Sequence, residues 1–214
     1  MNRRLAQRKG DGSHLFRSYK MEVHGYSAGL GIIRVCWVIF VVVWLVGAIS
    51  TKRAIYRESN AERIRYWLML VIGYFLVIKS SSLPSPFDWL VVPHTRSSAW
   101  IGAFLCVCGL VFAIWARVIL GRNWSGVITL KEGHEFIEHG PYRVVRHPIY
   151  TGIVAMFTGT VVAIGYFGGF LGLLLVFVSF LLKLTREEDL MLKHFPDQYA
   201  VYQIRVKRII PFLL

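Results

Sequence analysis

Long runs without a charged side chain alternate along this chain with short segments rich in arginine and lysine. The uncharged runs are Val35–Ile49, Ala99–Ala116 and Ile149–Leu182. A helix needs roughly 20 apolar residues to cross the hydrocarbon layer of a bilayer, so this pattern predicts membrane-spanning helices. We expect an all-α, polytopic membrane protein with about five transmembrane helices.

Helix positions follow from the same pattern. The first helix is expected at about 29–50, the second at about 64–78 and the third at about 99–120. The fourth and fifth share the run 149–182, which is too long for one ordinary span and has four glycines in its middle. A helical hairpin bent at Gly165–Gly169 fits this run.

Arginine and lysine are concentrated in three polar segments: 51–65, 117–146 and the tail after Leu182. The segment 79–96 has only Lys79 and Arg96. Basic loops stay in the cytoplasm, so the three segments are expected there and 79–96 on the opposite side. The basic N-terminal leader, residues 1–28, conflicts with this rule, because five spans place it on the side of the membrane opposite the C-terminal tail. The sequence alone leaves this conflict open.

Composition supports a membrane protein, since 55% of the residues are hydrophobic and 17% are charged. In a typical soluble domain, about a quarter of all residues are charged. The net charge of +13 also invites a nucleic-acid partner. We do not expect one, because the positive residues flank the spans, where topology and anionic headgroups explain them. The three cysteines lie inside predicted spans and suit packing, and no metal site is evident in the sequence.

A stiff polar turn precedes the predicted hairpin. The motif Gly140–Gly152 contains Arg146 and His147 between Pro141 and Pro148. Proline fixes φ and removes a hydrogen-bond donor, and Pro148 suits the first turn of the following helix. Ionisable groups at a membrane boundary are costly and usually serve a function. An interfacial anchor is the purely structural alternative.

A second polar cluster follows the hairpin. Lys183 and Glu187 are four residues apart and share one helix face, while Glu188 lies on a neighbouring face. A solvated helix with an ordinary ion pair is the simpler interpretation. However, apolar and aromatic residues nearby indicate that this region packs onto something: Leu190, Phe195, Tyr199 and Tyr202.

Together these residues resemble the isoprenylcysteine carboxyl methyltransferase family. That family is part of a wider group of integral-membrane methyltransferases that includes phospholipid N-methyltransferases. The resemblance rests on Pro141-Tyr-x-x-x-Arg-His-Pro-x-Tyr150-x-Gly152, then Glu187-Glu188-x-Leu190, then the aromatic residues and a terminal Arg-x-x-Pro. It covers about 122–211, close to the C-terminal half, and is more specific for the wider group than for the substrate.

The resemblance implies S-adenosylmethionine as cofactor, bound at the cytoplasmic face. His134, Glu135, Phe136 and Ile137 would line its adenosine, and Tyr142 would close the loop over it. The turn formed by His147, Pro148, Ile149 and Tyr150 would hold the methionine portion, and Glu187 or Glu188 would meet the ammonium group. Lys183 or Arg205 would hold the acceptor carboxylate. Lys183 stands where the family more often has arginine. Lysine keeps the positive charge but cannot bind a carboxylate through two parallel hydrogen bonds, as arginine does.

The sequence therefore predicts three parts: the leader 1–28, transmembrane helices in 29–120, and a methyltransferase region 121–214 with the hairpin 149–182 and a C-terminal helix. The expected reaction methylates the carboxylate of a lipophilic, prenylcysteine-like acceptor that enters from the bilayer. Membrane lipids are the other expected partners, and the oligomeric state stays open.

Three alternatives remain at this stage. One is a phospholipid or other lipid N-methyltransferase, whose amine acceptor needs an acidic or aromatic surface, so Lys183 and Arg205 favour a carboxylate. Another is a sterol-reductase-like enzyme with a nicotinamide cofactor, although such proteins tend to be larger. The last is a membrane partner protein without enzymatic activity.

Overall fold

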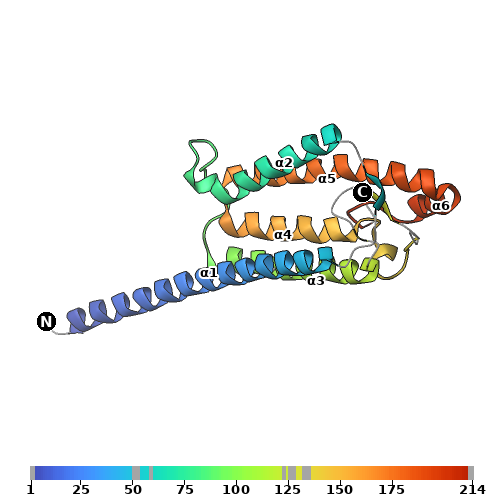
Figure 1. Ribbon diagram of the computed structural model, residues 1–214. Coiled ribbons are helices and arrows are strands. Elements are labelled where there is room, and N and C mark those ends of the chain that lie inside the picture. The colour runs from blue at the N-terminus through green and yellow to red at the C-terminus, as the bar shows by residue number, and fades with distance from the viewer. Residues whose placement is uncertain are drawn as a thin grey trace.

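Five long helices form the body of the computed structural model, which describes residues 3–49, 54–57, 60–121, 124, 129–131 and 136–211 (Figure 1). They are α1 (Arg3–Ile49), α2 (Asn60–Lys79), α3 (Arg96–Leu120), α4 (Pro148–Ile164) and α5 (Phe167–His194). Within the described residues, four helices are long and apolar enough to cross a membrane, and Pro148–Ile164 is a shorter apolar helix. The expected helical membrane architecture is confirmed.

Three helix boundaries differ from those predicted. The first helix begins at Arg3, not near residue 29, because arginine, lysine and glutamine are good helix formers without being apolar. The second runs from Asn60 to Lys79, which also exceeds its apolar core. The third begins at Arg96, since Thr95 and Ser98 form a capping box.

The helices pack in two groups. α1 lies along α3, α3 lies along α4, and α2 lies along α5. Glycines let the backbones approach closely: a Cβ on Gly152 of α4 would lie 2.5 Å from the Gly109 carbonyl oxygen of α3. A Cβ on Gly172 of α5 would lie 2.5 Å from the Gly73 carbonyl oxygen of α2. Small residues at helix crossings are typical of membrane proteins.

The predicted hairpin is formed by α4 and α5, but its bend is tighter than expected. Gly165 caps α4 with φ of 79°, a left-handed conformation that favours glycine, and α5 already begins at Phe167. Gly168 and Gly169 therefore belong to α5 rather than to the bend. The Gly165 carbonyl accepts hydrogen bonds from the backbone N–H groups of Val91 and Val92, which holds the turn against the preceding loop.

The polar connections gather at one end of the bundle. Here α6 (Pro196–Arg205) follows α5, and β1 (Ala54–Arg57) pairs antiparallel with β2 (Thr129–Lys131), a small sheet that the sequence analysis did not foresee (Figure 1). The short 3₁₀ helix η1 (Ser80–Ser82) belongs to the opposite end, towards which the N-terminus of α1 also projects. The basic leader thus lies on the side of the 79–96 segment.

Candidate active site

Glu188 of α5 is the centre of a buried ion cluster. Its side chain is 3% exposed, and Oε1 accepts hydrogen bonds from Arg146 Nε at 2.8 Å and His147 Nε2 at 2.9 Å. Oε2 accepts from Arg208 Nη2 at 2.5 Å and Gln203 Nε2 at 3.2 Å. Both oxygens are therefore filled by groups of the protein. An ionised carboxylate accepts only, so His147 carries its proton on Nε2 in this contact.

The C-terminal segment lies along the turn before α4. The backbone N–H groups of Arg146 and His147 donate to the carbonyls of Lys207 at 2.7 Å and Arg208 at 3.0 Å. Thr151 Oγ1 donates to the Ile209 carbonyl at 2.7 Å. This backbone pairing brings the terminal Arg-x-x-Pro motif beside the motif that begins at Pro141.

Glu187 has a more open environment than its neighbour. Its side chain is 24% exposed, and Oε1 accepts a hydrogen bond of 2.8 Å from the Tyr150 hydroxyl. Lys183 Nζ lies 3.6 Å from the same oxygen, so the two side chains share one helix face, as their four-residue spacing predicts. Oε2 lies 3.8 Å from His147 Nδ1, which leaves it without a close hydrogen bond from that ring.

An aromatic cluster joins the polar loop to α6. The ring of Phe136 lies 5.8, 6.0 and 5.4 Å from the rings of Phe195, Tyr199 and Tyr202. The Tyr202 hydroxyl donates to the Tyr142 carbonyl at 2.5 Å. Burial raises the pKa of Tyr199 and of Tyr202 above the usual value, so both hydroxyls stay protonated. The cluster thus fixes the loop through neutral contacts.

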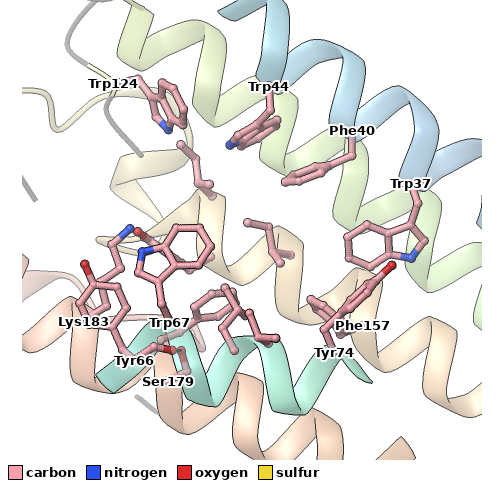
Figure 2. Close-up of a pocket in the computed structure, with 16 residues that line it drawn as sticks. Trp37, Phe40, Trp44, Tyr66, Trp67, Tyr74, Trp124, Phe157, Ser179 and Lys183 are labelled. Atoms are coloured by element: carbon pink, nitrogen blue, oxygen red, sulfur yellow. Dashed lines mark hydrogen bonds between the residues drawn. The ribbon is translucent and has the colours of Figure 1, made fainter. Parts of the chain in front are cut away.

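A pocket of about 520 Å³ lies beside the ion cluster around Glu188, between α1, α2, α4 and α5 (Figure 2). Most of its lining is aromatic or aliphatic. The rings from α1 and α2 are Trp37, Phe40, Trp44, Tyr66, Trp67 and Tyr74. Among the described lining residues, Lys183 alone carries a full charge. Figure 2 shows Lys183 near one end of the pocket and Trp37 with Phe157 near the other.

Lys183 links the pocket to the carboxylates. Its side chain is only 10% exposed, and Nζ lies 5.8 Å from the ring centroid of Tyr66 and 5.4 Å from that of Tyr150. These distances are within the range of cation–π attraction. The ammonium therefore stands at the boundary between an apolar pocket and the polar site around Glu187.

Most of the predicted site residues come together at this end. Pro148 occupies the first turn of α4, as expected, and Ile149 lines the pocket beside Tyr150. Ile137 packs in a cluster with buried Tyr142, whose hydroxyl donates to the Ala116 carbonyl at 3.4 Å. His134 and Glu135 lie outside the described residues.

Arg205, which was expected to hold the acceptor carboxylate, lies away from the pocket. Its side chain is 59% exposed and forms an ion pair of 2.8 Å with Glu138, which is also exposed. It does not line the pocket that contains Lys183. This position gives no support to its expected contact with an acceptor carboxylate.

Several important residues were missed by the sequence analysis. Arg208 completes the Glu188 cluster, and its place in the Arg-x-x-Pro motif was a usable signal. Trp37, Phe40 and Trp44 line the pocket, and their spacing of three and then four residues places them on one helix face. Arg117 of α3 was also missed. It donates to the carbonyls of Gly47 and Gly121 at 2.6 and 2.7 Å, and its guanidinium lies 4.5 Å from the Trp124 ring.

Comparison with known proteins gives consistent matches. The family model for phospholipid methyltransferases matches residues 97–198. A probable protein-S-isoprenylcysteine O-methyltransferase of Oryza sativa subsp. indica is 27% identical over 152 residues, covering 68% of this chain and 80% of that protein. The protein-S-isoprenylcysteine O-methyltransferase of Schizosaccharomyces pombe is 28% identical over 162 residues, covering 69% of this chain and 67% of that one.

A solved structure also matches: the eukaryotic intramembrane Ras methyltransferase, isoprenylcysteine carboxyl methyltransferase, at 25% identity and a TM-score of 0.49. The match covers 69% of this chain and 52% of that one, so this chain spans about half the length of the solved protein. The chain is therefore similar to isoprenylcysteine O-methyltransferases over about two thirds of its length, and to phospholipid methyltransferases over residues 97–198.

Proposed function

We propose that this protein transfers the methyl group of S-adenosylmethionine to the carboxylate of a lipophilic, prenylcysteine-like acceptor. The observation that carries the proposal is the place of Lys183. Its ammonium closes one end of an aromatic pocket and lies 3.6 Å from Glu187. The pocket suits an apolar tail, and Lys183 suits the carboxylate at the head of that tail.

The acceptor's tail has a route into the pocket from the bilayer. The pocket lies between the pair α1–α3 and the pair α2–α5, and Trp67, Val71 and Tyr74 line it while remaining exposed on the outer surface of α2. That surface faces lipid in a membrane protein. A volume of about 520 Å³ is within the range of small-molecule sites. The tail then enters sideways without crossing water.

The charge of Lys183 selects the acceptor's head group. A buried ammonium is costly unless it is paired, and a carboxylate beside it supplies a second anion next to Glu187. An amine acceptor that becomes cationic on methylation would instead be repelled. The description of the matching family model raises a phospholipid acceptor as the second candidate, and the position of Lys183 weighs against it.

The residues fit S-adenosylmethionine, with Glu187 as the better partner for its ammonium group. Glu188 has both oxygens filled by four side chains, whereas Glu187 is partly exposed and has Oε2 without a close hydrogen bond from His147. Phe136 and Tyr150 present rings that suit an adenine or a sulfonium. His134 and Glu135 remain predicted for the adenosine side.

When bound, S-adenosylmethionine supplies a methyl group on a sulfonium; the new O–CH₃ bond forms as the S–CH₃ bond breaks, and the electron pair of that bond stays on sulfur. No general base is required, because a carboxylate is already ionised at neutral pH. The task of Lys183 is to orient the acceptor oxygen, and the aromatic walls exclude water. Three arginine- and lysine-rich segments, 51–65, 117–146 and the tail after Leu182, belong to this end, and only the basic leader lies at the other, so we place the reaction at the cytoplasmic face.

A methyl-transfer assay tests the proposal. Purified protein in lipid nanodiscs is incubated with methyl-labelled S-adenosylmethionine and N-acetyl-S-farnesylcysteine, and the labelled product is treated with base. A methyl ester releases labelled methanol, which is the expected result. A base-stable product indicates methyl transfer to nitrogen and supports the second candidate. The same analogue with an esterified carboxylate is the matched control and accepts no label.

A further inference from the structure

We infer that Arg117 is a positioning residue, which holds the Trp124 indole as a wall of the acceptor pocket across from Lys183. This inference deepens the proposed function and rests on it. Arg117 lies in the last turn of α3 and does not itself line the pocket, whereas Trp124 does. The position of the indole then decides how firmly the head of the acceptor is held.

The charge of Arg117 has no anionic partner in the part of the chain that the structure describes. The residue is 7% exposed, and no ion pair joins it to a carboxylate of the described segments. Its Nε is buried and makes no hydrogen bond. A buried charge is costly unless it is compensated, and an ionisable residue in a membrane helix usually serves a function. The contacts that the guanidinium does make therefore indicate its role.

The guanidinium contacts the ends of two helices and one aromatic ring. Nη2 donates to the Gly47 carbonyl near the end of α1 at 2.6 Å, and Nη1 donates to the Gly121 carbonyl at the end of α3 at 2.7 Å. Carbonyls at a helix C-terminus are partly negative and lack intrahelical partners, so they suit a cation. The guanidinium also lies over the Trp124 ring, 4.5 Å from its centroid, where the ring quadrupole attracts it.

Trp124 is held through both its backbone and its ring. Its N–H donates at 3.4 Å to the Gly121 carbonyl, the same oxygen that accepts from Arg117. Its indole lies edge-on to the Trp44 ring of α1, with centroids 6.2 Å apart. The guanidinium therefore fixes the indole against α1 while it fastens the ends of α1 and α3.

Trp124 stands at the polar end of the pocket. It packs in the cluster that contains Ile149, a lining residue next to Tyr150, and the Tyr150 ring lies 5.4 Å from Lys183 Nζ. Figure 2 shows Trp124 and Lys183 at the same end of the pocket, Trp124 on the side of α1 and Lys183 on the side of α5. An acceptor whose carboxylate contacts Lys183 therefore rests the start of its tail against Trp124.

A double-mutant cycle of Arg117→Lys and Trp124→Ala tests this role. Lysine keeps the charge but has neither the planar face nor the fork of donors. Each single variant is expected to raise the KM for N-acetyl-S-farnesylcysteine about tenfold, the size of a desolvated cation–π contact, and to leave the KM for S-adenosylmethionine unchanged. The double variant is expected to be no worse than Trp124→Ala, because Arg117 acts through that indole. Trp124→Phe keeps a ring there and should rescue most of the loss.

Thermal unfolding separates this role from a purely structural one. Loss of the two carbonyl contacts lowers the unfolding temperature of Arg117→Lys whether or not the indole is present, whereas its effect on the acceptor KM requires the indole. Arg96→Lys, at the opposite end of α3, is the matched control for the cation. Trp100→Ala is the control for the ring, because Trp100 is exposed on α3 and does not line the pocket. Both controls keep the wild-type KM.

The inference is overturned if Trp124→Ala keeps the wild-type KM for the acceptor, a result that needs no Arg117 variant. It is also overturned if the two effects multiply in the double variant, or if the KM for S-adenosylmethionine rises as much as that for the acceptor. Arg117→Gln replaces Arg117→Lys in the cycle if the lysine variant does not fold. Failure of the wild type to methylate any prenylcysteine instead overturns the proposed function itself.

Discussion

The hydroxyl of Tyr150 donates a hydrogen bond of 2.8 Å to Glu187 Oε1 and thereby joins the wall of the aromatic pocket to the acidic site on α5. Lys183 contacts both residues, through the Tyr150 ring and the Glu187 carboxylate. The proposed sites for the two substrates therefore share these three side chains. A change at any of them is expected to affect the orientation of one substrate relative to the other.

Tyr150→Phe keeps the ring in the pocket and removes the hydrogen bond to Glu187. A hydrogen bond to a charged group contributes about 1.5–3 kcal/mol, so we expect kcat/KM to fall by roughly 10- to 100-fold. Steady-state methyl transfer measures this effect. Tyr74→Phe is the matched control on the exposed side of the pocket. An equal loss in both variants would contradict a specific role for the Tyr150 hydroxyl.

Lys183→Met removes the cation that we assign to the acceptor carboxylate. We expect kcat/KM for the acceptor to fall roughly 100-fold, because an ion pair in a dehydrated site is lost. The affinity for S-adenosylmethionine, measured by calorimetry, is expected to change far less. Lys183→Arg keeps the charge and is expected to retain activity. Lys193→Met, at an exposed position of the same helix, is the control and should behave like the wild type.

Glu187→Gln and Glu188→Gln separate cofactor binding from stability. The first is expected to weaken S-adenosylmethionine binding with little change in unfolding. The second leaves Arg146 and Arg208 without their anion, and breaking a buried ion pair costs about 3–5 kcal/mol. Calorimetry and thermal unfolding in detergent measure the two effects. The reverse pattern, with binding lost only in Glu188→Gln, would assign the cofactor's ammonium to Glu188.

Gly152→Ala tests the close crossing of α3 and α4. The added Cβ would lie 2.5 Å from the Gly109 carbonyl oxygen, so the two helices must separate. We expect a loss of about 1–3 kcal/mol in unfolding free energy, as for overpacked cores. Gly31→Ala on α1 is the control, since its Cβ would meet nothing within 4 Å. A stable Gly152→Ala protein would show that the crossing adjusts at little cost.

The sequence was informative wherever one local property determined the structure. Uncharged runs located the helices, the spacing of Lys183 and Glu187 placed them on one helix face, and Gly165 marked the hairpin bend. Helix ends were less predictable because capping and helix propensity, not hydrophobicity, set them. Arg3 and Thr95 illustrate these two causes.

Contacts between distant segments were beyond the sequence. Glu188 was expected to be one of two equal candidates for the cofactor, yet four side chains fill its oxygens. That outcome depends on how the C-terminal segment pairs with the turn before α4. The rotation of α1 and α2 about their axes likewise decides which rings face the pocket. The spacing of Trp37 and Trp44 is compatible with one helix face but does not show that this face lies opposite α2.

The most direct measurement compares the affinity of N-acetyl-S-farnesylcysteine with that of its neutral carboxamide, in the wild type and in Lys183→Met. Both ligands carry the same tail, so the difference isolates the contact between Lys183 and the carboxylate. We predict that the wild type binds the carboxylate roughly 10- to 100-fold more tightly, as expected for a charge-assisted contact, and that this preference disappears in Lys183→Met. A wild type that binds both equally, or a preference that survives in Lys183→Met, would contradict the assignment of the acceptor carboxylate to Lys183.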